Sequence, residues 1–163
     1  MIWLVRILIS LSLIIVIYQD FKERKVWAFL LPVIAGCGCY LFFQMSTIDY
    51  FLLSIAVNFC IVSTILGILY LISKFLLKKR AFYQAIGLGD ILFFLAIAVS
   101  FPTVSFLNFF VFAILFTFVL SLILKRLFYS AEKTIPLAGS MSIFILIVYL
   151  IHWFGFYHTI YLM

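Results

Sequence analysis

Long apolar stretches alternate with short polar segments along the whole chain. Arg6 lies in the first stretch and Asp90 in the fourth, while the other four contain no Asp, Glu, Lys or Arg. A helix that crosses a bilayer needs roughly 20 apolar residues. The pattern therefore predicts an all-α, polytopic membrane protein with about six transmembrane helices. These are expected at residues 2–19, 26–45, 50–73, 86–101, 103–124 and 135–155.

Composition supports the same class of protein. Hydrophobic residues make up 69% of the chain, charged residues only 10%, and the mean hydropathy is +1.39, which is far more apolar than a soluble domain requires. Pro102 favours a turn between the fourth and fifth helices over one continuous helix. The first segment has neither a preceding basic cluster nor a cleavage motif, so we expect a retained anchor. Without repeats or linkers, residues 1–163 are expected to form one domain.

The basic residues are strongly asymmetric. Ten of the eleven Lys and Arg residues lie in the polar segments at 20–25, 74–85 and 125–133, and only Arg6 lies elsewhere. In a six-span arrangement these three loops share one side, and basic loops are typically cytoplasmic. Both termini should then lie outside. This asymmetry explains the net charge of +6, so the bilayer is the expected partner and nucleic acid is not.

Cysteine and histidine do not form a recognisable metal motif. Cys37, Cys39 and Cys60 lie inside predicted helices and lack the paired C-x-x-C spacing of a zinc site. His152 and His158 are six residues apart, which places them on different faces of a helix. We expect packed thiols and interfacial histidines, with no metal and no cofactor.

Two acidic residues stand out. Asp49 is expected to cap the third helix, and Glu132 is expected to be a solvated surface charge. Asp20 ends the first predicted helix and Asp90 opens the fourth, so the topology places both at the cytoplasmic edge of the membrane. An ionisable group ahead of an uninterrupted apolar run is costly and usually functional. We therefore expect the two carboxylates to meet, although a polar residue at a membrane exit also accounts for Asp20.

The chemistry of such a pair is specific. Two neighbouring carboxylates in a poorly hydrated site cannot both ionise at low cost, so one proton is shared. The ionised member can activate water while the protonated member donates to a carbonyl oxygen, which hydrolyses a peptide bond without a metal. Gly87 and Gly89 remove side chains ahead of Asp90, which allows a sharp turn or close approach by a helix or an extended peptide.

At these residues the chain resembles the type IV prepilin peptidases, a family of G-x-G-D intramembrane aspartyl proteases. The segment "YQDFKERKVW" contains Asp20 followed by a basic stretch, as in the first catalytic motif of the family. The segment "GLGD" comprises Gly87, Leu88, Gly89 and Asp90 and reproduces the second motif. The segment "TIPLAGSM", with Pro136, is similar to the entry into the family's last span.

The resemblance implies an aspartic endopeptidase that removes the short basic leader from type IV prepilin-like or pseudopilin precursors. Its implied location is the bacterial inner membrane, with Asp20 and Asp90 catalytic on the cytoplasmic side. The chain starts at the catalytic core, so we expect a minimal form without the cysteine-bearing methyltransferase segment. Trp27 stands where the family usually has proline, and Leu92 stands where a lysine often follows the G-x-G-D motif.

Two other functions are compatible with the sequence. A non-catalytic relative acting in pilus or secretion assembly would retain the fold and tolerate loss of either aspartate. A small proton-coupled transporter would also place aspartates and glycine-broken helices in a membrane, although usually near its midplane. The sequence leaves the identity of the pilin and the oligomeric state open.

The charge pattern predicts the topology directly. Single cysteines introduced at positions 22, 79 and 130, in a background without the native cysteines, should all be labelled from the cytoplasmic side. Labelling of any one of them from outside would contradict the six-span arrangement.

Overall fold

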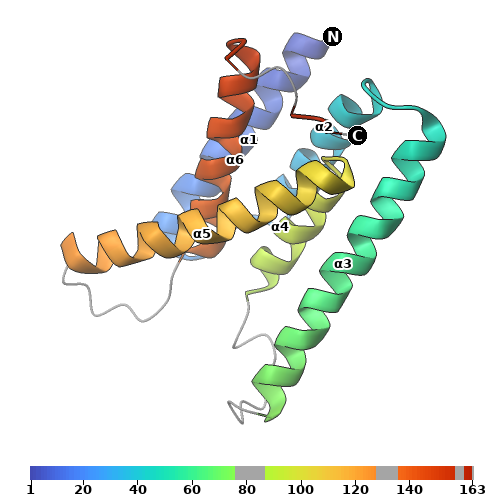
Figure 1. The fold of residues 1–163 in the computed structure, drawn as a ribbon. Coiled ribbons are helices and arrows are strands. Elements are labelled where there is room, and N and C mark those ends of the chain that lie inside the picture. Colours follow the sequence, from blue (N-terminus) through green and yellow to red (C-terminus); the bar gives the residue numbers. More distant parts are fainter. Residues whose placement is uncertain (76–86, 128–135, 157–159, 163) are drawn as a thin grey trace.

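The chain folds into six helices and no strand within residues 1–75, 87–127, 136–156 and 160–162, which the computed structural model describes (Figure 1). The all-α expectation is therefore confirmed for these residues. The helices are α1 (Ile2–Glu23), α2 (Leu30–Phe43), α3 (Ile48–Phe75), α4 (Leu88–Ala98), α5 (Thr103–Leu127) and α6 (Leu137–Trp153).

Three of the helices have the length and apolarity to cross a membrane, namely α1, α3 and α5. The helices α2, α4 and α6 are also apolar but contain only 14, 11 and 17 residues. At a rise of 1.5 Å per residue, α4 is about 17 Å long, whereas the hydrocarbon core of a bilayer is about 30 Å thick. These features are those of a membrane protein, and six full spans remain a prediction.

The start of α2 differs from the expectation. The helix begins at Leu30, not at residue 26, and α1 continues to Glu23 before Arg24 adopts a left-handed conformation with φ 55°. Pro32 explains the late start, because a proline is tolerated in the first turn, where the amides have no helical partner. In a helix that began at residue 26, Pro32 would remove an internal hydrogen bond.

The break between α4 and α5 falls where Pro102 predicts it. The helix α4 ends at Ala98 and α5 begins at Thr103. Asn58 of α3 is fully buried, and its side-chain amide donates hydrogen bonds to the carbonyls of Ala98 and Phe101, at 2.8 and 2.9 Å. This amide satisfies backbone acceptors at the end of α4 and ties α3 to the turn.

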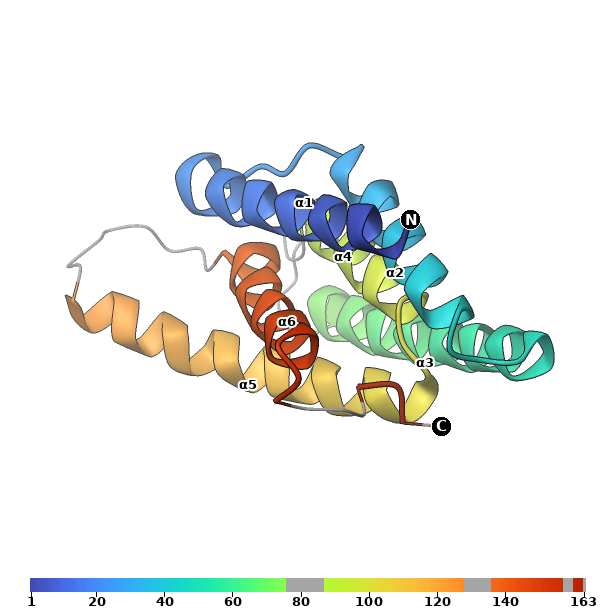
Figure 2. The same cartoon turned by 90° about the horizontal axis from the view of Figure 1, so that it is seen from above.

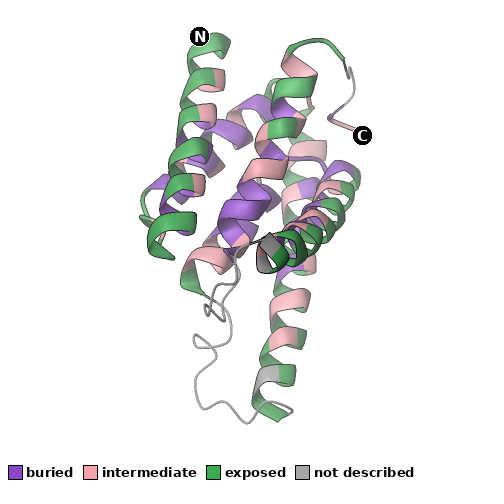
Figure 3. Ribbon diagram, turned by 90° about the vertical axis from the view of Figure 1, so that its left-hand side faces the viewer, coloured by how far each residue is buried: buried purple, intermediate pink, exposed green. Residues whose placement is uncertain are grey.

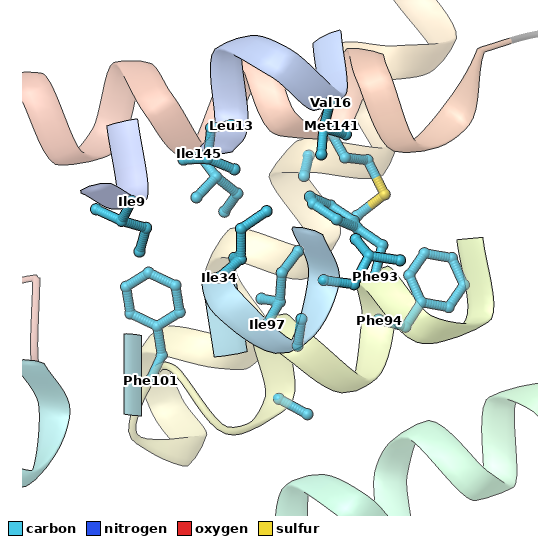
Figure 4. Packing of buried hydrophobic residues seen from close by; sticks show 14 of the residues in the cluster. Ile9, Leu13, Val16, Ile34, Phe93, Phe94, Ile97, Phe101, Met141 and Ile145 are labelled. Atoms are coloured by element: carbon cyan, nitrogen blue, oxygen red, sulfur yellow. The ribbon is translucent and has the colours of Figure 1, made fainter. Parts of the chain in front are cut away.

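The bundle is organised around α1, α4 and α6. The helix α1 packs against α6 and α2, α4 packs against α2 and α3, and α5 packs mainly against α6 (Figures 1 and 2). Buried side chains from α1, α2, α4 and α6 meet in a continuous apolar core (Figure 4). Its members include Ile9, Leu13, Val16, Ile34, Phe93, Phe94, Ile97, Phe101, Met141 and Ile145.

The outer faces of the long helices are exposed (Figure 3), and many of the exposed side chains are large and apolar. Leu53 of α3 and Phe118 of α5 are 63% and 59% exposed. In water such surfaces would favour aggregation, whereas in a bilayer they contact lipid chains at no cost. Buried residues in this protein therefore mark where helices contact one another, and exposed residues mark the surface suited to lipid. Apolar side chains occur in both groups.

Gly38 permits the close packing of α2 on the end of α4. A Cβ atom at this position would lie 2.1 Å from Ser100 Oγ and 2.5 Å from Ser100 Cβ. We therefore expect Gly38→Ala to lower the free energy of unfolding by about 1–3 kcal/mol, as overpacking does. Unfolding by SDS in mixed micelles would measure the change.

Gly36 of the same helix is the matched control. A Cβ atom there would meet no atom within 4 Å, so Gly36→Ala should leave stability unchanged or raise it through better helix propensity. Equal stability of the two variants would contradict the proposed tight contact between α2 and α4.

Candidate functional site

Asp20 and Asp90 lie at the same end of the bundle although 70 positions separate them in sequence. Asp20 is in the last turn of α1 and is only 7% exposed, while Asp90 is in the first turn of α4 and is partly buried. The structure thus brings the two predicted site residues together from different helices. Their catalytic role remains a prediction.

The first turn of α6 holds both carboxylates. The backbone N–H of Ala138 donates to Asp90 Oδ1 at 3.1 Å, and the next N–H, that of Gly139, donates to Asp20 Oδ2 at 2.5 Å. The first four amides of a helix have no acceptor within the helix and carry its positive dipole end. Two consecutive free donors therefore hold the two aspartates side by side.

Asp90 also organises the start of its own helix. Gly87 is the N-cap of α4 in an extended conformation, and Asp90 is the third helical residue after it. The Asp90 carboxylate therefore lies in the first turn of α4, where a negative charge interacts favourably with the positive end of the helix dipole. Coulombic repulsion acts between Asp90 and Asp20. Backbone donors counter this repulsion, and a single shared proton would relieve it.

The absence of a side chain at Gly139 allows α1 to approach α6. A Cβ atom at Gly139 would lie 3.0 Å from both Cβ and Oδ2 of Asp20 and 3.1 Å from Cδ2 of Phe21. A side chain here would therefore push Asp20 away from the amide that holds it. Gly139 is a small residue where two membrane helices need close contact.

The predicted glycines flank the carboxylates in different ways. Gly87 is exposed, and a Cβ atom there would lie 3.3 Å from Asp90 Oδ2, so its absence leaves one side of the carboxylate open. At Gly89 a Cβ atom would meet only Val26, at an ordinary 3.8 Å. Pro136 is the N-cap of α6, two residues before the first of the two donor amides. Its fixed φ suits a helix start.

Gln19 is a site residue that sequence reasoning missed. Its side chain is buried, and Oε1 accepts a hydrogen bond of 3.0 Å from the backbone N–H of Trp27. This bond holds the segment between α1 and α2 against α1, and Val26 of that segment lies next to Gly89. A proline at position 27 would have no N–H to donate. The signal in the sequence was a polar residue beside Asp20 in an apolar run.

The other polar residues named from the sequence lie elsewhere. Asp49 is in the first turn of α3 and not ahead of it as a cap, and His152 is in the last turn of α6. Cys37, Cys39 and Cys60 are free thiols on α2 and α3. In the described part of the chain, no three His, Cys, Asp or Glu side chains cluster as metal ligands would. Glu132 and His158 lie outside the described residues.

No protein-family model, curated protein or solved structure matches the chain. A pair of carboxylates, one buried and one partly exposed, can share a proton, polarise a carbonyl and activate water. Backbone amides fix their positions, so the pair is preorganised for this chemistry.

Substitution of Gly139 tests how the pair is held. Gly139→Ala should lower the free energy of unfolding by about 1–3 kcal/mol, because the new methyl group displaces Asp20 and Phe21. Amide hydrogen exchange at residue 139 should also become faster, since its hydrogen bond to Asp20 is lost.

Gly67→Ala on α3 is the control for this substitution, because a Cβ atom there meets nothing within 4 Å. Unchanged exchange at residue 139 in Gly139→Ala would contradict the observed geometry.

Proposed function

We propose that the protein is an intramembrane aspartic endopeptidase of the prepilin-peptidase type, with Asp20 and Asp90 as its catalytic pair. Its substrates would be type IV prepilin-like precursors, from which it removes a short basic leader. The proposed location is a bacterial cytoplasmic membrane, with the pair on the cytoplasmic side.

One observation carries the proposal. Asp20 and Asp90 accept hydrogen bonds from the consecutive amides of Ala138 and Gly139. Burying two like charges beside each other is unfavourable, and apolar residues could pack the same helix ends at a lower free-energy cost. A shared role in proton transfer explains why both are there.

The proposed reaction is hydrolysis by water. One carboxylate takes a proton from water, whose oxygen attacks the carbonyl carbon of the scissile peptide bond, and the other donates its proton to the carbonyl oxygen. When the tetrahedral intermediate collapses, the carbon–nitrogen bond breaks and the leaving amine takes a proton from one carboxylic acid of the pair. A hydroxyl group of the intermediate gives its proton to the other carboxylate as the product carboxyl group forms. The two carboxylates then again hold one proton between them.

The open side of the pair suits an extended substrate. Gly87 and Leu88 are exposed beside Asp90, and Leu88 is 56% exposed. A scissile peptide could approach across Gly87, which has no side chain of its own beside the carboxylate, while the apolar helix of the precursor remains in lipid. The basic loops do not favour a basic leader, so we assign those charges to topology and not to recognition.

Loss of either carboxylate should abolish processing. Asp20→Asn and Asp90→Asn, each coexpressed with a prepilin, should leave the leader uncleaved, because an amide can neither activate water nor share the proton. Immunoblotting of the precursor and mature pilin would measure the effect. Purified protein with the same precursor in detergent micelles would exclude processing by another peptidase.

Glu23→Gln and Asp49→Asn serve as matched controls. Glu23 lies on the same helix as Asp20, and Asp49 lies in the first turn of α3. Both variants lose one carboxylate and should process the precursor at the normal rate. Normal processing by either member of the pair would refute the mechanism and leave an assembly role or proton transport as the better explanation.

A further inference from the structure

A second polar site lies at the other end of α1. Arg6 is 14 residues from Asp20 on the same helix, which corresponds to about 21 Å along its axis. This separation approaches the roughly 30 Å thickness of a hydrocarbon core, so the two residues lie near opposite faces of a bilayer. No Asp or Glu occurs in the first 19 residues of the chain to neutralise Arg6.

Two tryptophans fix the guanidinium of Arg6. Its Cζ atom lies 5.1 Å from the ring centroid of Trp3 on α1 and 5.6 Å from that of Trp153 on α6. Cation–π contacts orient the planar group through its face and do not use its N–H donors, which point outward from the edge. Within the described part of the chain, Arg6 Nε is buried and has no hydrogen-bond partner.

Arg6 also lines a cavity of about 540 Å³. The other lining residues are Met1, Ile2, Trp3 and Tyr40, so α1 and α2 both contribute. The volume is in the range of ligand sites in proteins, and a charged side chain with apolar and aromatic neighbours is a common composition for such a site. The apolar part of this lining suits an acyl chain, and the guanidinium suits an anion.

Taken together, the cavity, the oriented guanidinium and its missing acceptor lead to one inference. We propose that this cavity binds a phosphate-bearing anion through Arg6, with the headgroup of an anionic phospholipid as the main source. The planar fork of arginine matches phosphate oxygens. Trp3 and Trp153 are typical of the headgroup region, where lipid phosphates are abundant. A phosphate oxygen in this cavity would accept a hydrogen bond from Arg6 Nε. That bond would remove the free-energy cost of leaving a buried donor unpaired.

Tryptophan fluorescence can report on this cavity directly. The chain has three tryptophans, and Trp27→Phe leaves only the two that contact Arg6. In this background, with any tag at the C-terminus, the detergent-solubilised protein is titrated with short-chain phosphatidylglycerol, short-chain phosphatidylcholine and inorganic phosphate. Phosphatidylglycerol should give a saturable change and bind about tenfold more tightly than phosphatidylcholine.

Arg6→Gln should weaken phosphatidylglycerol binding by about tenfold or more, because a charge-assisted hydrogen bond is lost. Arg126→Gln removes the same charge from an exposed position on α5 and should bind within about twofold of the parent. Arg6-dependent binding of inorganic phosphate alone would identify a soluble anion as the ligand source. Equal binding of both lipids, or normal binding by Arg6→Gln, would overturn the proposal.

A second measurement covers the case in which Arg6→Gln does not fold. Phosphatidylglycerol with a photoreactive group near its headgroup is added to the unsubstituted protein in nanodiscs, and crosslinked residues are mapped by mass spectrometry. Crosslinks should concentrate at the start of α1 and near Tyr40. Crosslinks confined to other parts of the chain would refute the site.

Discussion

Two consecutive backbone amides at the start of α6 determine how the ends of three helices are arranged. The amides of Ala138 and Gly139 hold Asp90 of α4 and Asp20 of α1. Apolar contacts elsewhere in the core favour compactness but have little direction, so many registers would bury similar area. Hydrogen bonds to charged acceptors are directional and strong where water is scarce. This small polar cluster therefore defines the register of α1 and α4 on α6.

The polar cluster requires helices that approach closely. At Gly139 the space for a side chain is occupied by Asp20, and at Gly38 it is occupied by Ser100. Association in a bilayer depends on packing and on interhelical hydrogen bonds, because lipid removes most of the hydrophobic driving force between helices. Glycine at these two positions thus contributes to both the fold and the site. The same feature keeps the buried carboxylate of Asp20 within reach of a backbone donor.

Polar function in this protein is concentrated at the two ends of α1. The Asp20–Asp90 pair lies at one end, and the cavity with Arg6 lies at the other. Between them the buried face of α1 is largely apolar, with Ile9, Leu13 and Val16 in the core. This separation is the one that a bilayer favours, since charge is tolerated near the interfaces and costly in the hydrocarbon. The proposed peptidase site and the proposed lipid site therefore lie at opposite ends of the same helix.

The sequence by itself determined the class of structure. Long apolar runs specified six apolar helices, Pro102 specified the break after α4, and the rarity of acidic residues distinguished Asp20 and Asp90 as candidate site residues. These signals are local, because apolarity, proline geometry and the cost of a charge act at the residue that carries them. Pro32 also encodes the late start of α2 at Leu30, although the helix was predicted to begin at residue 26.

Only the tertiary structure decided how the aspartates are held. Their partners are backbone amides, which every residue carries, so no side-chain pattern could have singled out Ala138 or Gly139 as donors. The role of Gln19 likewise depends on the path of the chain eight residues later. The cavity at Arg6 is lined by residues of α1 and α2, and the two tryptophans that contact Arg6 come from opposite ends of the sequence. Such features depend on the distances between helices. Tertiary packing determines these distances, and the local sequence does not.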